Sequence, residues 1–313
     1  MSTGVALQAV LTGLAQGAVY GLVGLGFSLC YRLVRVLSLA HGDLIVGALL
    51  TAVLVVVGTT PVVSSPGVAG SVALVLLTLL GGAVLGSALY LVAVRPFVAG
   101  PDHDPQSGVT GWVAATLAAG LLVREGLGLV FTREAYAVAD PLHLPTGVVG
   151  LPAGGELPIR VLAVLAIALT AGLATERYVV ASRTGKAMRA VAEDRETSAL
   201  MGIPADRLAL SAFGLAGVLA GLAGLLAAPG TSVTVSVGVV LGLKGVAAAL
   251  LGRLGSLRGA LAGGLVLGVV ESLAVASDSL GVAYRDVLAL AVLVAVLALR
   301  PEGLGSRVAG DVE

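Results

Sequence analysis

Charged residues are scarce in this sequence. Asp, Glu, Lys and Arg make up 12% of its 313 residues, about half the share expected of a soluble globular domain. The chain is instead 58% hydrophobic and contains 45 glycines. A soluble protein of this length needs many more polar residues on its water-facing surface. The composition therefore argues against a soluble enzyme and favours a helical membrane protein, a class rich in glycine and other small residues.

Other absences exclude further classes. Disordered chains are poor in apolar residues, and collagen needs glycine at every third position, so neither class fits. The formal net charge is zero, which gives no basic excess for a nucleic-acid partner. Cys30 is the only cysteine and lies in an apolar run, so we expect it to pack rather than to form a disulfide. No basic residue precedes Arg32, so we do not expect a cleavable signal peptide.

The sequence also lacks the motifs of catalytic and metal sites. Its only Gly-Lys pair, Gly185-Lys186, is followed by alanine and does not complete a phosphate-binding loop. The histidines His41, His103 and His143 are scattered, and no metal-ligand spacing or G-x-S-x-G elbow occurs. We therefore expect no catalytic residue, no metal, no cofactor and no ATPase activity within this chain. An intramembrane enzyme would need a nucleophile and base that the sequence does not display.

Apolar runs long enough to cross a bilayer follow one another along the chain, since a membrane-spanning helix needs about 20 apolar residues. The candidate spans are 7–30, 38–58, 68–94, 109–131, 157–175, 208–228, 233–252, 257–277 and 282–299. The second opens with polar residues and is a candidate half-helix, and the ninth is short. We predict an all-α, polytopic transmembrane bundle of eight or nine spans, forming one domain over residues 1–313.

The basic residues indicate an orientation. If the polar segment 176–207 faces the cytoplasm, nine alternating spans place the N-terminus outside and the C-terminus inside. The outer side then holds only Arg133, Arg160 and Arg285. The inner side holds thirteen basic residues: Arg32, Arg35, Arg95, Arg177, Arg183, Lys186, Arg189, Arg195, Arg207, Arg253, Arg258, Arg300 and Arg307. Cytoplasmic loops of membrane proteins carry an excess of Lys and Arg over external loops, so this distribution supports the orientation.

Two polar segments interrupt the spans. The segment 132–156 is rich in proline and glycine, and we expect an external loop whose structure the sequence does little to predict. In the segment 176–207, residues 186–201 have good helix propensity. Gly202 and the nearby Pro204 suit the end of a helix. We predict one short surface helix there, on the cytoplasmic face.

Ionisable residues within the spans are costly in lipid and are therefore candidate functional groups. Lys244 lies in the middle of its segment, and Glu271 lies in the next span. The rise per residue of a helix places the two about 10 Å apart along the membrane normal. These two residues either line a translocation path or form a structural pair. In a third alternative, their long side chains extend to the membrane interface. His41 and Asp43 open the second segment. Asp43 either caps that helix or belongs to a polar break near the path.

Glycines recur at every fourth residue in several spans, a spacing that allows helix backbones to approach closely in lipid. Chance is a real alternative for any one pair in a chain of this composition. The recurring sets are Gly13, Gly17 and Gly21; Gly217 and Gly221; and Gly264 and Gly268. No internal repeat is visible, so an inverted-repeat secondary transporter gains no support.

Four segments together resemble the LivH-type permeases, the membrane subunits of bacterial branched-chain amino acid ABC importers. The N-terminal signature of that family resembles the segment Gly13–Phe27 with Tyr31-Arg32 and Leu39–Asp43. Its coupling loop resembles Arg189–Asp194 with Ala199–Ile203, and its next inner loop resembles Gly242–Lys244 through Leu251–Ala260. The last matching segment is Gly263–Glu271. The family's usual Gly-Gly-Ile-Gly-Ser reads here as Gly252-Arg253-Leu254-Gly255-Ser256, so contacts of that turn with a partner are expected to differ.

The resemblance implies a bacterial plasma-membrane permease that pairs with a second, LivM-like permease. Two ABC ATPase subunits would dock on the cytoplasmic loops, and an extracytoplasmic solute-binding protein would deliver the solute. The resemblance assigns the coupling role to Arg189, Glu193, Asp194, Ala199 and Gly202.

Two alternatives stay open from the sequence. Urea and short-chain amide importers use similar permeases, so the solute is not fixed. A stand-alone channel or secondary carrier would instead use Asp43, Lys244 or Glu271 for ions, and it would need neither ATP nor partners.

Overall fold

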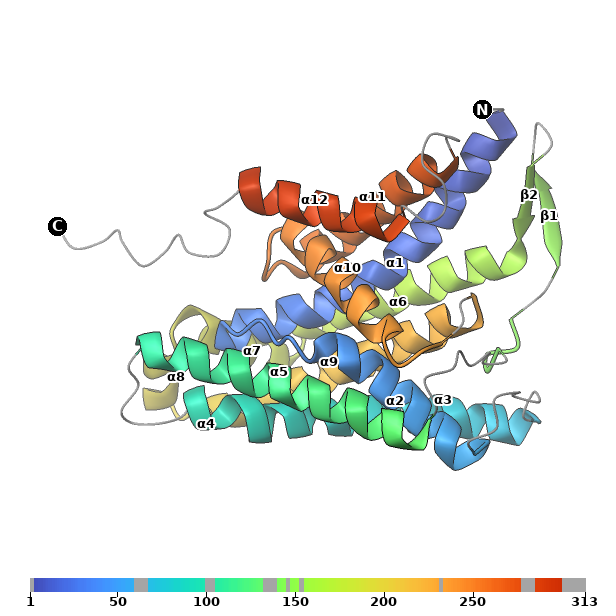
Figure 1. The fold of residues 1–313 in the computed structure, drawn as a ribbon. Coiled ribbons are helices and arrows are strands. Elements are labelled where there is room, and N and C mark those ends of the chain that lie inside the picture. Colours follow the sequence, from blue (N-terminus) through green and yellow to red (C-terminus); the bar gives the residue numbers. More distant parts are fainter. Residues whose placement is uncertain are drawn as a thin grey trace.

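The computed structural model describes residues 3–58, 67–98, 105–131, 140–144, 147–151, 155–230, 233–276 and 285–299. Within these residues the chain forms a bundle of helices with one short hairpin (Figure 1), which confirms the all-α prediction. The elements are α1 (Thr3–Val34), α2 (His41–Val56), α3 (Val68–Leu89), a π-turn (Tyr90–Val94), α4 (Arg95–Val98), α5 (Pro105–Val130), β1 (Val148–Leu151), β2 (Gly155–Pro158), α6 (Ile159–Ala181), α7 (Arg183–Glu193), α8 (Arg195–Leu200), α9 (Ala205–Ala227), a 3₁₀ turn (Ala228–Gly230), α10 (Val237–Leu251), α11 (Leu257–Ala276) and α12 (Arg285–Leu299).

Each of the nine predicted spans corresponds to a helix, although the helices differ in length. Among the described residues, six helices are long and apolar enough to cross a membrane: α1, α3 with its continuation to Val98, α5, α6, α9 and α11. The helices α2 and α10 have 16 and 15 residues and are largely buried inside the bundle. The polar opening of segment 38–58 is divided by the start of α2, because Ser38 precedes the helix while His41 and Asp43 lie in its first turn.

Glycine contacts join the helices at the spacing that the sequence predicts. A Cβ atom on Gly17 of α1 would lie 2.5 Å from the carbonyl oxygen of Gly264 on α11. Gly82 of α3 and Gly217 of α9 are in equally close backbone contact. Only glycine allows two helix backbones to approach this closely in a membrane. The predicted close approach of the helices at these glycines is therefore confirmed, and chance spacing does not explain it.

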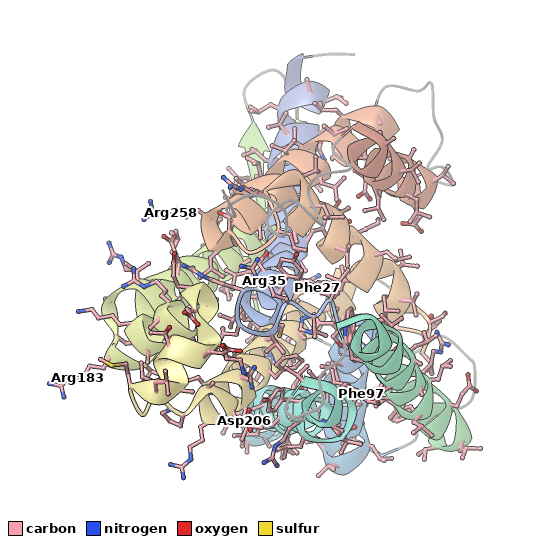
Figure 2. All side chains as sticks on the ribbon, turned by 90° about the vertical axis from the view of Figure 1, so that its left-hand side faces the viewer. Phe27, Arg35, Phe97, Arg183, Asp206 and Arg258 are labelled. Carbon is pink, nitrogen blue, oxygen red and sulfur yellow. The ribbon has the colours of Figure 1, made fainter. Side chains whose placement is uncertain are left out.

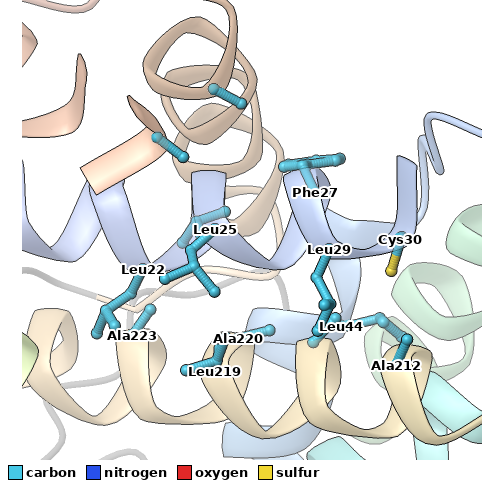
Figure 3. Close-up of a cluster of buried hydrophobic side chains, with 14 of the residues drawn as sticks. Leu22, Leu25, Phe27, Leu29, Cys30, Leu44, Ala212, Leu219, Ala220 and Ala223 are labelled. Atoms are coloured by element: carbon cyan, nitrogen blue, oxygen red, sulfur yellow. The ribbon is translucent and has the colours of Figure 1, made fainter. Parts of the chain in front are cut away.

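Larger apolar side chains fill the space between these glycine contacts. Figure 3 shows leucines of α1, including Leu22 and Leu25, directed toward Ala220 and Ala223 of α9. All four side chains are fully buried or nearly so. Large residues on one helix thus meet small residues on the other, which gives dense packing without polar atoms.

The loop 132–156, for which the sequence predicts no particular structure, contributes to a hairpin where the structure describes it. Strands β1 and β2 pair antiparallel, with Val148 opposite Pro158. An ion pair between Asp140 and Arg160, at 3.4 Å, ties the preceding turn to α6. The described part of this proline- and glycine-rich loop therefore includes a strand pair. The stretches 132–139, 145–146 and 152–154, and the basic residues Arg133, Arg300 and Arg307, lie outside the described residues.

The polar segment before α9 forms two short helices, so the prediction of one helix over 186–201 is wrong. The chain breaks at Asp194, whose backbone is extended, with φ −146° and ψ 110°. The Asp194 side chain accepts a hydrogen bond from the Thr197 amide and caps the start of α8. The predicted end is confirmed, because Gly202 follows α8 with a positive φ of 77°. Helices α7 and α8 lie at the end of the bundle opposite the β1–β2 hairpin (Figure 1).

Candidate functional site

Helix α7 is amphipathic and lies with one face on the bundle. Met188 and Val191 are buried in the main hydrophobic core. Gly185 is in backbone contact with Val179 near the end of α6, where a side chain would not fit. The N-terminus of α7 is capped by Ser182, whose side chain accepts a hydrogen bond from the Gly185 amide at 2.9 Å. Apolar packing therefore fixes α7 to the membrane helices while its outer face stays free.

A polar cluster around Asp206 fixes α8 to the same bundle (Figure 2). Asp206 is in the first turn of α9 and accepts hydrogen bonds from Arg195 of α8 at 2.9 Å and from the Tyr90 hydroxyl at 3.2 Å. Arg95 of α4 lies 3.6 Å away. This carboxylate thus joins α8 and α9 to the π-turn that follows α3. Sequence reasoning missed it, because its partners are up to 116 residues away.

The residues predicted to couple to the ATPase differ in where they point. Glu193, Asp194, Ala199 and Gly202 are exposed at the outer surface of the segment. Hydrogen bonds from the Thr197 hydroxyl and amide hold the pKa of Asp194 below its usual value of 3.8. Arg189 instead donates to the Val180 carbonyl at 3.1 Å and lies half-buried against α6.

The end of α8 also presents apolar side chains that the sequence analysis did not single out. Leu200 is 88% exposed and Met201 is 79% exposed. They lie at the end of α8, which is opposite the hairpin in the bundle (Figure 1), and they precede the left-handed turn at Gly202. Exposed neighbouring apolar side chains outside the lipid-facing helices are typical of a surface that a partner protein covers.

A second polar cluster lies inside the bundle, around Lys244. Its ammonium is 2.8 Å from Glu271 of α11 and 2.8 Å from Asp286 of α12. The Tyr20 hydroxyl of α1 accepts from Lys244 and donates to Glu271, both at 3.3 Å. The Lys244 and Glu271 side chains are 7% and 0% exposed, whereas Asp286 is 58% exposed. The structural pair expected between Lys244 and Glu271 is therefore present, and the side chains bridge the offset that helical rise predicts.

A cavity of about 560 Å³ opens beside this cluster. Its walls are largely aliphatic, with Val19, Val164, Leu226, Val240 and Leu241 among the lining residues. Its polar lining residues are Thr12, Gln16, Tyr20, Arg160, Lys244 and Asp286. Apolar walls with a few polar groups are typical of small-molecule sites.

His41 and Asp43 do not line this cavity, so the four intramembrane candidates fall into two groups. The His41 ring packs on Phe27, with the ring centroids 4.6 Å apart, and Asp43 lies against Gly120 of α5. Both side chains are buried, and within the described residues neither the His41 Nε2 nor the Asp43 Oδ1 has a hydrogen-bond partner. The expectation that Asp43 caps α2 is wrong, because Ala40 is the cap residue and no side chain fills that role.

Comparisons with known proteins agree with this architecture. A family model described as "Branched-chain amino acid transport system / permease component" matches residues 9–297. The high-affinity branched-chain amino acid transport system permease protein BraD of Pseudomonas aeruginosa is 27% identical over 306 residues, covering 96% of each chain. The LivH permease proteins of Salmonella typhimurium and Escherichia coli K12 are each 28% identical, again with 96% of both chains covered.

The extent of these matches confirms the resemblance that the sequence motifs indicated. The chain is a multi-pass membrane permease subunit of an ABC importer and not a catalytic subunit, so ATP hydrolysis takes place on separate ATPase subunits. A solute-binding protein is the other kind of partner that such a system requires. The described geometry, with long apolar helices and a short polar segment at one end, suits that division of labour. This chain belongs to the family of permease components of branched-chain amino acid transport systems.

Proposed function

We propose that this permease imports branched-chain amino acids and that α7 and α8 together, the coupling segment, receive the motion of the ATPase subunits. The observation that carries the proposal is the construction of this segment. One side is attached to the membrane helices through Met188 and Val191. The other side exposes carboxylates and the apolar tip formed by Leu200 and Met201.

The Asp206 cluster supports a route from the coupling segment to the bundle. A displacement of α8 pulls on Asp206 through Arg195, and Asp206 begins α9. The same carboxylate contacts Tyr90, where the helical repeat switches to a π-turn. Such turns are common at functional sites and bends. We infer that α9 and α3 move together when the coupling segment is pushed.

The five coupling candidates take different roles in this proposal. Glu193 and Asp194 meet donors on the ATPase, while Ala199 and the turn at Gly202 shape the contact. Arg189 transmits motion instead, because its hydrogen bond ties α7 to the end of α6. Leu200 and Met201 add an apolar contact area, which their high exposure supports.

We further propose that the end of the bundle carrying the coupling segment is cytoplasmic. Arg32, Arg35, Lys186, Arg253 and Arg258 all gather there around one cavity, and cytoplasmic loops are enriched in basic residues. The hairpin and the start of α1 then face the exterior (Figure 1).

The cavity beside Lys244 supports an amino-acid solute. It is lined by charged groups of both signs next to aliphatic walls: Lys244 and Asp286, which are paired with each other, and Arg160, which is paired with Asp140. A zwitterion with an aliphatic side chain complements that lining, whereas uncharged urea or an amide does not use the charges. We assign Lys244 to the lining of the translocation path. Glu271 supplies the negative charge that orients Lys244. His41 and Asp43 do not line this cavity. We keep them as translocation-path candidates only in a separate polar region at the start of α2.

The test is ATP-driven leucine uptake by proteoliposomes containing the complete transporter, with a LivM-like second permease, two ATPase subunits and the binding protein. The variant Glu193→Gln/Asp194→Asn removes both charges while Asn keeps the α8 cap. We expect unchanged membrane insertion and a loss of uptake relative to ATP hydrolysis. The variant Val149→Gln, exposed on the hairpin at the opposite end, is the control and should transport normally. Full uptake by the double variant would overturn the coupling role.

The alternative of a stand-alone channel or carrier gives the opposite result in a simpler measurement. The purified chain in liposomes, without ATP or partners, should show no leucine or ion flux above empty vesicles. Flux under those conditions would refute the proposed dependence on ATPase subunits.

A further inference from the structure

A second cavity, of about 1070 Å³, lies at the end of the bundle that carries the coupling segment. It is open to the surface and is lined by the ends of α1 and α6, by α7 and by the turn between α10 and α11. Six basic side chains line it, and only Glu176 and Glu193 oppose them; the basic residues are Arg32, Arg35, Lys186, Arg189, Arg253 and Arg258. Arg35 and Arg258 mark this region in Figure 2.

The positive charge of this basic cavity is not balanced by the residues around it. Glu176 is already paired with Arg258, which leaves Glu193 against the other basic groups. The Nε atom of Arg189 is buried without a hydrogen-bond partner among the described residues. Basic groups that line one space repel one another, and an anion bound among them lowers that repulsion. The cavity therefore has the chemistry of an anion site.

The backbone holds two of these arginines in an unfavourable conformation. Arg35 and Arg253 have φ values of 58° and 72°, in the left-handed region that glycine normally occupies. Such strain persists where the surrounding structure over-determines it, and it is concentrated at functional sites. Both strained residues line the basic cavity.

An apolar groove adjoins the basic cavity. It has a volume of about 740 Å³ and runs between α6 and α11, lined by Leu169, Leu173, Leu261 and Leu265. Glu176 and Arg258 line both spaces, so the two meet at that ion pair. Leu173 is 52% exposed on a membrane-spanning helix, which places the groove at the lipid-facing surface.

We propose that the basic cavity and this groove together bind one anionic phospholipid. The headgroup phosphate lies among the arginines and an acyl chain follows the groove between α6 and α11. A free anion fills the cavity but leaves the groove unexplained, whereas a phospholipid matches both its charge and its apolar part. With the orientation proposed above, the lipid comes from the cytoplasmic leaflet, where anionic headgroups attract basic clusters. The bound headgroup braces α7 against the α10–α11 turn.

The experiment is native mass spectrometry of the assembled transporter, titrated with phosphatidylglycerol or with phosphatidylethanolamine of the same acyl chains. We expect phosphatidylglycerol to be retained preferentially. Arg32→Gln and Arg253→Gln should each lower its apparent affinity about fivefold, because one basic group near an anionic headgroup contributes about a factor of five. Because binding is read without transport, failure of the import function would leave this result unaffected.

The matched control is Arg183→Gln, which removes the same charge from the exposed side of α7 outside both spaces. Its affinity for phosphatidylglycerol should equal that of the unmodified protein. A melting temperature recorded in detergent without added lipid separates misfolding from lost binding. Equal binding of phosphatidylethanolamine, an equal loss in Arg183→Gln, or displacement by equimolar glycerol 3-phosphate would overturn the proposal. Absence of bound phosphatidylglycerol from the assembled transporter would also overturn the proposal, because it would mean that the docked ATPases cover the cavity.

Discussion

The helix pair α1–α11 and the coupling segment α7–α8 use charged residues in opposite ways. Between α1 and α11 the backbones touch at glycines, and Glu271 of α11 is paired with Lys244 of the neighbouring helix α10 inside the bundle. In the coupling segment, Glu193 and Asp194 are exposed, with Glu193 at the edge of the basic cavity. Charges that face inward in lipid hold helices together, because leaving one unpaired is costly. Charges that face outward at the bundle end are available to another protein.

The two regions also differ in how they are attached. The α1–α11 pair is in contact along several helical turns, from Gly13 to Gly21. The coupling segment is held by one apolar face and by the Asp206 cluster. A region with fewer buried contacts opens and moves at lower free-energy cost. We therefore expect substitutions in α1–α11 to reduce stability and substitutions in the coupling segment to reduce coupling.

The largest expected effect comes from removing the buried cation in Lys244→Met. Glu271 would then be buried without its partner, which costs about 3 kcal/mol of stability. Thermal unfolding in detergent measures the loss. The double variant Lys244→Met/Glu271→Met should recover most of it, and Asp286→Asn, at a more exposed partner, should cost much less. Equal losses for all three would show that the cluster does not act through charge pairing.

The next effect comes from filling the helix interface with Gly17→Val. Its Cβ would lie 2.5 Å from the Gly264 carbonyl oxygen, so α1 and α11 must separate. Overpacking of this kind costs about 1–3 kcal/mol. The control is Gly126→Val on α5, where an added Cβ meets nothing within 4 Å. Melting temperatures of the two variants should differ, and similar values would contradict the close backbone contact.

A smaller effect on stability, with a larger effect on function, is expected for Asp206→Asn. The ion pair with Arg195 is partly exposed, so its loss should change stability by less than about 1 kcal/mol. Leucine uptake per ATP hydrolysed should nevertheless fall, because the link from α8 to α9 is weakened. Arg207→Gln, at the exposed neighbouring residue, serves as the control for loss of a charge, of opposite sign, from the same turn. Unchanged coupling in Asp206→Asn would place the transmission route elsewhere.

The smallest effect is a pH dependence of the α8 cap. The folded pKa of Asp194 lies below its usual 3.8, so its ionised form is favoured in the folded segment. The capping contribution is therefore fully present above pH 3.8 and is lost as the pH falls through the lower, folded value. Hydrogen exchange of the Thr197 amide, corrected for intrinsic pH dependence, should show this loss only at acid pH. Asp194→Asn should abolish the pH dependence, and a transition near neutral pH would contradict the assignment.

Much of the architecture follows from local patterns. The span boundaries come from runs of apolar residues, and the close helix contacts come from glycine at every fourth position. The end of the coupling segment at Gly202 is also a local effect, since a left-handed residue favours glycine. The break at Asp194 was not predicted, because the helix propensity of residues 186–201 as a whole is high. The preference of one aspartate for a cap position is a weaker signal than that propensity.

The sequence by itself determined that this chain is a polytopic helical permease without its own ATP-binding motif, because composition and short motifs carry that information. The tertiary structure decided which charges meet. Tyr20 and Glu271 are 251 residues apart along the chain and share a hydrogen bond, while His41 and Asp43 lie away from them. The Asp206 cluster and both charged cavities likewise join elements distant in sequence. Such contacts depend on helix packing angles and side-chain reach, which no local pattern encodes.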